Sequence, residues 1–420
     1  MRLDEFIEGL ERDPDAERRR LAAEKSYEIL DYIDNAQRSF NEVLQGDSLF
    51  GSTAPSIFVG RSNYPRVSTG LLSPMDPESN AADFATSGEW YRQGLSIDDV
   101  FQRRTGLLNS TRSAAVDVND VWDGFVGVQR EVAIAGRPVD VEIGLDNASS
   151  LDLQPTIDEI STPTGPRARA RSADLAENPY IPRPVQKTLE DDDWQAQGAM
   201  NYLYRRGFDV YDINKILSAG ALGQAQTRKL VPTRWSITAV DDTVGQYLRG
   251  RIRNAPSIDS VQVWTNEYMG NQFWVVLAPG SWEFELVEMK APGSIWNPDP
   301  GGALWMGADS EGYEGRTAYV DETSGAYYAA RLGVLEHLES IGRQAKCLVL
   351  RHVSDDYWGP VGVWQVRESV RNAFDGDHGE AESFHDAVRQ VAPLLPVSLN
   401  DLRRKSSMVS GIQANLTDFS

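Results

Sequence analysis

The sequence predicts an α+β fold with an N-terminal helical segment, two mixed domains with antiparallel sheets, and a flexible C-terminal tail. Three observations lead to this prediction. Stretches with helical periodicity and stretches with strand periodicity are mixed without the regular alternation of a parallel α/β sheet. The chain has 420 residues, enough for about two to three domains. Hydrophobic residues make up 41% of it, which suffices for a core in each domain.

Residues 1–46 are expected to be mostly helical. Pro14 suits the first turn of a helix, and Asp15 and Glu17 suit the positive end of the helix dipole. Gly46 is a typical stop. The apolar residues between them recur mostly at helical steps: Leu21, Ile29, Leu30, Ile33, Phe40, Val43 and Leu44. This pattern predicts a helix that packs through one face.

Residues 47–160 are expected to form the first α+β domain. A stretch rich in Gly, Ser and Pro contains one short strand, Ser56–Val59. Ser96 and Asp99 have capping-box spacing, which predicts the start of a helix. From Phe125 to Leu145 apolar side chains alternate with others on both sides of a turn near Gly136. This alternation predicts a hairpin with one buried face.

Residues 161–189 are expected to form a linker, because the stretch is rich in proline and shows no apolar periodicity. It contains a small basic patch formed by Arg167, Arg169 and Arg171. A solvated linker is the simpler interpretation of that patch. An extended arm that contacts phosphates is the functional alternative, and the sequence leaves both open.

Residues 190–399 are expected to form the second α+β domain, followed by a flexible tail at 400–420. Three apolar runs with turns at Gly270 and Gly280 predict a meander of three strands. The elements expected in this domain are strands at Ser260–Glu267, Gln272–Leu277, Trp282–Met289 and Lys346–Leu350, and helices at Ser324–Ile341 and Phe384–Val391.

The charge balance is strongly acidic, with a formal net charge of -21. Only seven of the 41 cationic residues are Lys: Lys25, Lys187, Lys215, Lys229, Lys290, Lys346 and Lys405. An acidic surface with little Lys is typical of proteins from a salt-loaded cytoplasm, although an ordinary acidic protein that prefers Arg would look similar. Net negative charge does not exclude a nucleic-acid partner, because phosphate contacts can form locally.

The remaining sequence features limit the compartment and the chemistry. The chain has no apolar run long enough for a transmembrane helix, and its first residues lack the apolar core of a signal peptide. A cytoplasmic protein without membrane partners is therefore expected. The single cysteine, Cys347, excludes an internal disulfide and a multi-cysteine zinc site. His378 and His385 lie among acidic residues, but their spacing favours a solvated helix start over a metal site.

One short pattern permits metal-dependent catalysis. Glu288 and Lys290 lie two apart on an expected strand and so project to the same face. In metal-dependent nucleases such a pair holds a divalent ion and orients the attacking water, with a further carboxylate from an earlier strand. Asp259 or Glu267 is a candidate for that carboxylate. A salt-bridged strand end is the alternative, and no catalytic set is assigned.

The C-terminal tail carries the sharpest pattern. Gln413, Leu416 and Phe419 follow one another at steps of three, so a single 3₁₀ turn would place Leu416 and Phe419 on one face. They come after a polar stretch, 401–410, suited to a flexible tether. The pattern resembles the peptide that binds sliding clamps, except that Ser420 stands where a second aromatic residue is usual. A frayed tail is the alternative.

The chain as a whole resembles the archaeal Nre family of DNA repair proteins. The most specific stretch is Phe50–Arg61 (FGSTAPSIFVGR), followed by Tyr64–Val67 (YPRV). The resemblance also includes Thr233–Ser236 (TRWS) and Gly325–Arg331 (GAYYAAR). Many members carry a four-cysteine zinc motif near the N-terminus, which this chain lacks. Its acidic composition is similar to that of haloarchaeal members.

The resemblance implies DNA damage repair, with recruitment by the sliding clamp PCNA through the tail residues Gln413, Leu416 and Phe419. From the residues themselves, Arg61 and Arg66 are candidates for phosphate contacts and Tyr64 for stacking on a base, so DNA is the expected second partner. A purely structural role for this loop is equally compatible with the sequence. A metal-dependent nuclease and a nucleotide-using enzyme built around Gly60 and Arg61 remain alternative functions. No cofactor is identified.

Overall fold

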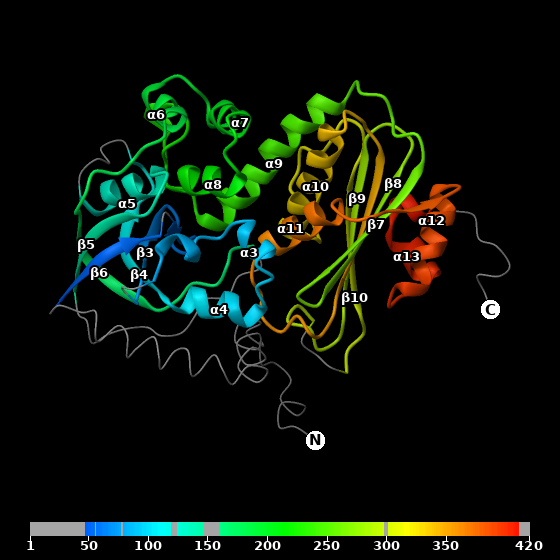
Figure 1. Ribbon diagram of the computed structural model, residues 1–420, viewed down its shortest axis with the longest axis horizontal. Coiled ribbons are helices and arrows are strands. Elements are labelled where there is room, and N and C mark those ends of the chain that lie inside the picture. The colour runs from blue at the N-terminus through cyan, green and yellow to red at the C-terminus, as the bar shows by residue number, and fades with distance from the viewer. Residues whose placement is uncertain are drawn as a thin grey trace.

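The computed structural model describes residues 47–54, 56–76, 79–118, 124–146, 160–297 and 301–410. The expected N-terminal helical segment and the clamp-binding peptide both lie outside these residues. The described residues form two mixed sheets, which lie on opposite sides of a layer of helices (Figure 1). The α+β prediction is confirmed. No helix among the described residues is long and apolar enough to cross a membrane.

The first sheet has the strand order β1-β5-β6-β4-β3-β2 and is antiparallel except where β4 pairs with β6. Its strands are β1 (Ser48–Thr53), β2 (Ile57–Val59), β3 (Arg66–Pro74), β4 (Leu107–Ala115), β5 (Val139–Leu145) and β6 (Arg167–Leu175). The helices attached to it are α3 (Glu89–Arg92), α4 (Ile97–Thr105) and α5 (Gly124–Ile134). The Ser96 capping box is present, so the predicted start of α4 is confirmed.

The hairpin expected at Phe125–Leu145 is wrong in its first half. Residues 124–134 form helix α5, and only Val139–Leu145 is a strand. Phe125, Gln129, Val132 and Ala133 are buried, and their spacing of four, three and one is that of a helix face. The spacing of the valines is therefore compatible with both the two-residue period of a strand and the 3.6-residue period of a helix.

The linker expected at 161–189 is also wrong over its central part. Arg167–Leu175 is strand β6, which lies inside the first sheet between β5 and β4. Ala168, Ala170 and Ala173 are buried, whereas Arg169 and Arg171 are exposed. This is strand periodicity with alanine as the inward residue, a weak hydrophobic signal that the prolines nearby obscured.

The second sheet has the strand order β10-β9-β11-β8-β7-β12. Its strands are β7 (Val261–Tyr268), β8 (Asn271–Ala278), β9 (Glu283–Lys290), β10 (Trp305–Glu311), β11 (Lys346–Val353) and β12 (Gly379–Ala381). The predicted strands exist, but the meander is wrong, because β11 lies between β8 and β9 and runs parallel to β9. Pairing of a later strand between two earlier ones leaves no local trace in the sequence.

Helices cover both faces of the second sheet. The central layer contains α6 (Arg183–Glu190), α7 (Ala196–Arg205), α8 (Val210–Ser218), α9 (Thr233–Ile252), α10 (Ser324–Ser340) and α11 (Trp364–Ala373). The outer face carries α12 (Phe384–Val391), α13 (Leu399–Lys405) and α14 (Ser407–Ser410). Short 3₁₀ turns lie at Ala81–Phe84, Ala225–Thr227 and Ala392–Leu394. The helices predicted at 324–341 and 384–391 are confirmed.

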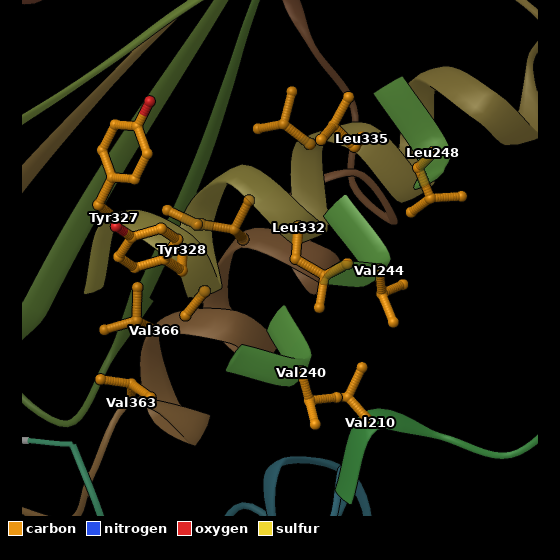
Figure 2. Packing of buried hydrophobic residues seen from close by; sticks show 14 of the residues in the cluster. Val210, Val240, Val244, Leu248, Tyr327, Tyr328, Leu332, Leu335, Val363 and Val366 are labelled. Atoms are coloured by element: carbon orange, nitrogen blue, oxygen red, sulfur yellow. The ribbon is translucent and has the colours of Figure 1, made fainter. Parts of the chain in front are cut away.

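The largest core lies between α9, α10, α11 and the inner face of the second sheet. Figure 2 shows Val240, Val244 and Leu248 of α9 along one side of the helix, facing Leu332 and Leu335 of α10. The steps of four between the α9 residues place them on one stripe. This packing holds α9 rigidly in the middle of the molecule, and α9 carries side chains of both sites described below.

Candidate nucleic-acid interface

The loop between β2 and β3 carries the three residues that the sequence suggested for DNA contact. Arg61, Tyr64 and Arg66 are all exposed. Arg66 donates from Nε to the Ser113 hydroxyl at 3.2 Å. The backbone N–H of Val59 donates to Thr233 Oγ1 at 2.9 Å, which ties the start of this loop to the first turn of α9.

Tyr64 joins this loop to a second aromatic residue. Its ring packs on Trp235 of α9, with ring centroids 5.3 Å apart. Trp235 is 44% exposed and Tyr64 47% exposed, so both rings present a face to solvent. Large aromatic side chains usually lose this exposure on folding, because their burial stabilises the fold. An exposed pair of rings is therefore a candidate binding surface.

Trp235 lines a groove of about 830 Å³, which we call the aromatic groove. It runs along one side of α9 and along the segment between β10 and α10. The aromatic and cationic side chains that line it are Trp235, Tyr319 and Tyr328, and Arg234, Arg249 and Arg316. Tyr319 is 52% exposed and packs on Tyr328 with centroids 5.3 Å apart.

Each of the two carboxylates that line the aromatic groove pairs with an arginine, although Arg331 also pairs with the buried Glu311. Asp242 Oδ1 lies 2.5 Å from Nη2 of the buried Arg331. Glu314 Oε1 lies 2.7 Å from Nη2 of Arg253. Arg249 donates to the backbone carbonyl oxygen of Tyr313. Arg316 donates to that of Ser310 and also lies 3.6 Å from Asp309 Oδ1. The groove thus brings three arginines together on a strongly acidic protein, beside two carboxylates that already have arginine partners.

The wall that carries Tyr319 is held by Asp309. Its carboxylate accepts hydrogen bonds from the backbone N–H groups of Asp321, Glu322 and Thr323 and from the Thr323 hydroxyl. Burial by itself would raise the pKa of Asp309, but these hydrogen bonds outweigh burial and lower the pKa below its usual value. Arg316 fixes the same wall by donating to Tyr319 O at 3.3 Å.

An aromatic groove with this composition suits unpaired bases. Each base can stack on an aromatic ring, and arginine can hold the phosphates between the bases. From the sequence we expected contacts by Arg61, Tyr64 and Arg66, and in the structure Tyr64 packs on Trp235 in the wall of the groove. The sequence analysis did not identify Trp235 or Tyr319 as candidate site residues. A tryptophan within the polar run Thr233–Ser236 was the available signal.

The structure does not assemble the nuclease constellation suggested by Glu288 and Lys290. Glu288 is buried, and its carboxylate lies 2.5 Å from Arg351 and 3.5 Å from Lys290. Strands β11 and β8 lie between β9 and β7. Across these strands, Glu288 pairs with Arg351, Arg351 with Phe273, and Phe273 with Asn266. Glu267 follows Asn266 and so projects to the opposite face. Asp259 is exposed and pairs with Arg343.

The described residues also contain no cluster of His, Cys, Asp and Glu that could hold a metal ion. Cys347 is buried, and burial raises the pKa of its thiol. His378 packs on Trp264 with centroids 4.6 Å apart, whereas His385 accepts from Arg389 in α12. The two histidines therefore have different, structural surroundings.

The tether expected at 401–410 is wrong. These residues belong to α13 and α14, and Leu402 and Val409 are fully buried against the second sheet. Glu285 of β9 accepts hydrogen bonds from the Ser406 hydroxyl and from the backbone N–H groups of Ser407 and Met408. The polar residues that suggested a tether thus cap the helices or lie on the protein surface. Gln413, Leu416 and Phe419 lie outside the described residues.

Comparison with known proteins agrees with the resemblance noted in the sequence. Residues 21–297 match the family model for archaeal Nre, N-terminal, and residues 311–419 match archaeal Nre, C-terminal. The chain is 68% identical over 420 residues to DNA repair protein NreA of Haloferax volcanii, covering all of both chains.

Two more distant relatives come from Archaeoglobus fulgidus. The chain is 39% identical to its DNA repair protein NreA over 352 residues, covering 84% of this chain and 86% of the relative. It is 34% identical to DNA repair protein NreB over 372 residues, covering 88% and 92%. No solved structure matches the chain. On the family models and these identities, the chain belongs to the archaeal Nre family.

Proposed function

We propose that this chain is a DNA repair factor that binds unpaired DNA in the aromatic groove and is recruited by the sliding clamp PCNA through residues 413–419. The repair role is supported by the names of its relatives, each of which is a DNA repair protein. The observation that carries the DNA-binding part is the exposed pair Tyr64 and Trp235 beside a groove with three arginines.

DNA binding is tested by fluorescence anisotropy with a single-stranded oligonucleotide, the matching duplex and a forked duplex. We expect the strand and the fork to bind more tightly than the duplex, because only unpaired bases can stack on Trp235 and Tyr319. Affinity should fall with salt, since phosphate contacts release counterions. Equal binding of all three DNAs, unaffected by Trp235→Ala, would contradict a groove that binds unpaired bases.

Clamp recruitment rests on the spacing of Gln413, Leu416 and Phe419. A peptide of this kind concentrates its affinity in a few anchors, so Phe419→Ala should cost about 2–4 kcal/mol of binding free energy. Ser420→Phe should tighten binding by supplying a second aromatic ring. Calorimetry with purified clamp measures both.

The control for the clamp experiment is deletion of residues 413–420. The described helices end at Ser410, so we expect the deletion to abolish clamp binding with little change in melting temperature. Clamp affinity that is unchanged after the deletion would exclude this recruitment. DNA affinity should be the same in the deleted and intact chains, which separates the two parts of the proposal.

A further inference from the structure

A second cavity lies on the other side of α9 and shares only Ile160 with the lining of the aromatic groove. We call it the central cleft; its volume is about 550 Å³. Thr233, Ile237 and Asp241 of α9 line the cleft, whereas Arg234, Trp235 and Thr238 of the same helix line the groove. Its other walls come from residues 56–58, from 85–92, from 160–164, and from α8 and α11. It therefore lies where the first sheet meets the helical layer.

Arg104 of α4 is a buried cation to which the described residues supply no carboxylate partner. It lines the central cleft and is only 4% exposed. Its Nε donates to Pro163 O at 2.8 Å, and its Nη1 to Phe84 O at 3.4 Å. The structure shows no ion pair for it among the described residues. Burial lowers the pKa of its guanidinium to about 10. A buried charge that lacks a counterion destabilises the fold unless an anion joins it.

The other cleft arginines differ from Arg104 in this respect. Arg367 lies 2.5 Å from the buried Asp241, and Arg371 contacts Glu336, Glu368 and Asp209. The protein therefore supplies counterions for its buried arginines elsewhere in the same cavity. Arg104 is the position in the cleft where an external anion would complete the pairing.

Further polar atoms in the central cleft have no hydrogen-bond partner within the described part of the chain. The Thr164 hydroxyl is buried without a hydrogen bond, and so are Oδ1 of Asp241 and Nε of Arg367. Buried polar atoms without partners are rare, because each costs free energy. The Thr86 and Thr162 hydroxyls also line the cleft and contact each other at 3.4 Å. The region around Arg104 thus combines a guanidinium with several hydroxyl groups, which suits the multiple oxygens of a phosphate.

The rest of the cleft is larger than a phosphate needs. A volume of about 550 Å³ lies in the usual range for small-molecule sites. Its walls include Tyr211 and Trp364, and Tyr211 is fixed by a hydrogen bond of 2.7 Å from its hydroxyl to Glu368. Rings of this kind can pack against a base or sugar. The free oxygen of Asp241 can accept a hydrogen bond from an exocyclic amine.

We infer that the central cleft binds a phosphate-bearing ligand of nucleotide size, with Arg104 and Thr164 as the residues that hold the phosphate. Such a ligand has two possible sources, a free nucleoside monophosphate or the phosphorylated end of a DNA strand. The inference does not depend on the proposed DNA binding, because the cleft and the aromatic groove use opposite sides of α9.

The test is a thermal-shift and calorimetry series on the full chain. The probes are inorganic phosphate, the four deoxynucleoside monophosphates, and one oligonucleotide with and without a 5′-phosphate. We expect a monophosphate to raise the melting temperature, or the 5′-phosphorylated oligonucleotide to raise it more than the oligonucleotide without that phosphate. Binding of the monophosphates would identify a free nucleotide as the ligand. Preference for the phosphorylated oligonucleotide alone would identify a strand end. No stabilisation by the monophosphates, together with equal stabilisation by the two oligonucleotides, would overturn the inference.

Two variants locate the binding. Arg104→Gln should weaken binding at least tenfold, while Arg103→Gln on the same helix, which lies outside the cleft, should leave it unchanged. Thr164→Val removes only an unpartnered hydroxyl, so it should keep the unliganded melting temperature and still weaken binding severalfold. Thr164→Val therefore tests the site even if Arg104→Gln fails to fold. Unchanged affinity in both Arg104→Gln and Thr164→Val would mean that the phosphate binds elsewhere. Trp235→Ala should affect the oligonucleotides but not the monophosphates.

Discussion

Tyr64 and Trp235 pack ring against ring, with centroids 5.3 Å apart and planes tilted by 53°, although the two residues belong to opposite halves of the sequence. The contact joins the β2–β3 loop to the first turn of α9, next to the hydrogen bond between Val59 and Thr233. Both rings remain partly exposed, so neither half of the sequence covers the pair completely. The aromatic groove begins at the place where the chain brings the two halves together.

Trp235→Ala is expected to weaken binding of single-stranded DNA by about 1–3 kcal/mol, which is about 5- to 150-fold, because one stacking platform is lost. The melting temperature should change little, since Trp235 is 44% exposed. Fluorescence anisotropy and a thermal melt measure the two quantities. Tyr180→Ala is the matched control: Tyr180 is 59% exposed but does not line the groove. Equal effects of the two substitutions on DNA affinity would argue against the groove.

Glu285→Ala is expected to destabilise the protein by about 2–4 kcal/mol. The carboxylate is buried and accepts from the Ser406 hydroxyl and from the N–H groups of Ser407 and Met408, so its removal takes the acceptor from one buried and two partly buried donors. Denaturant unfolding measures the change. Glu283→Gln on the same strand is the control, because Glu283 and its partner Lys346 are both substantially exposed and such pairs contribute little. Equal stability of the two variants would mean that α14 is not held through Glu285.

Glu288→Gln is expected to lower stability without removing a metal site. Glu288 is the carboxylate partner of the buried Arg351, which otherwise has only the Asn271 amide oxygen. We therefore expect a lower denaturation midpoint and the same response of the melting temperature to Mn²⁺ as in the unaltered protein. A Mn²⁺-induced stabilisation that disappears in Glu288→Gln would restore the nuclease interpretation.

Periodicity in the sequence predicted elements better than it predicted their partners. Ser96, Ser324–Ile341 and Phe384–Val391 carry local capping or spacing signals, and the structure confirms the helices there. The position of β11 between β8 and β9 depends on long-range pairing, which no local pattern records. Residues 125–134 have a spacing that serves both a strand and a helix, and tertiary packing decided between them.

In the candidate sites, too, local signals were predictable from the sequence and features that depend on long-range folding were not. Tyr64 was found because it stands in a distinctive motif, whereas Tyr319 becomes a groove residue only when Asp309 folds the segment before α10. The central cleft was not predicted at all. Arg104 is one of 34 arginines in the sequence, and nothing around it indicates that folding buries its guanidinium where the described residues offer no carboxylate. Burial and pairing are properties of the assembled fold.

His337 predicts a pH dependence of stability. Burial, together with the nearby His378, lowers the pKa of His337 to about 4, and its ring stacks on Phe374 with centroids 3.9 Å apart. In the unfolded chain a histidine has a pKa of about 6.5. Between these two values the unfolded state binds a proton that the folded state does not bind. His337 therefore contributes a loss of stability as the pH falls from about 6.5 towards 4, and no further loss below that.

His337→Phe should flatten this part of the stability profile, because phenylalanine keeps the stacking on Phe374 and cannot take up a proton. The measurement is the free energy of unfolding from denaturant titrations at several pH values between 4 and 8, at constant salt. His385→Gln is the control, since His385 lies in α12 on the other face of the second sheet. We expect the control to keep the acid-side slope of the unaltered protein. If His337→Phe keeps that slope as well, the dependence has another origin, and His337 is protonated in the folded state at mildly acidic pH.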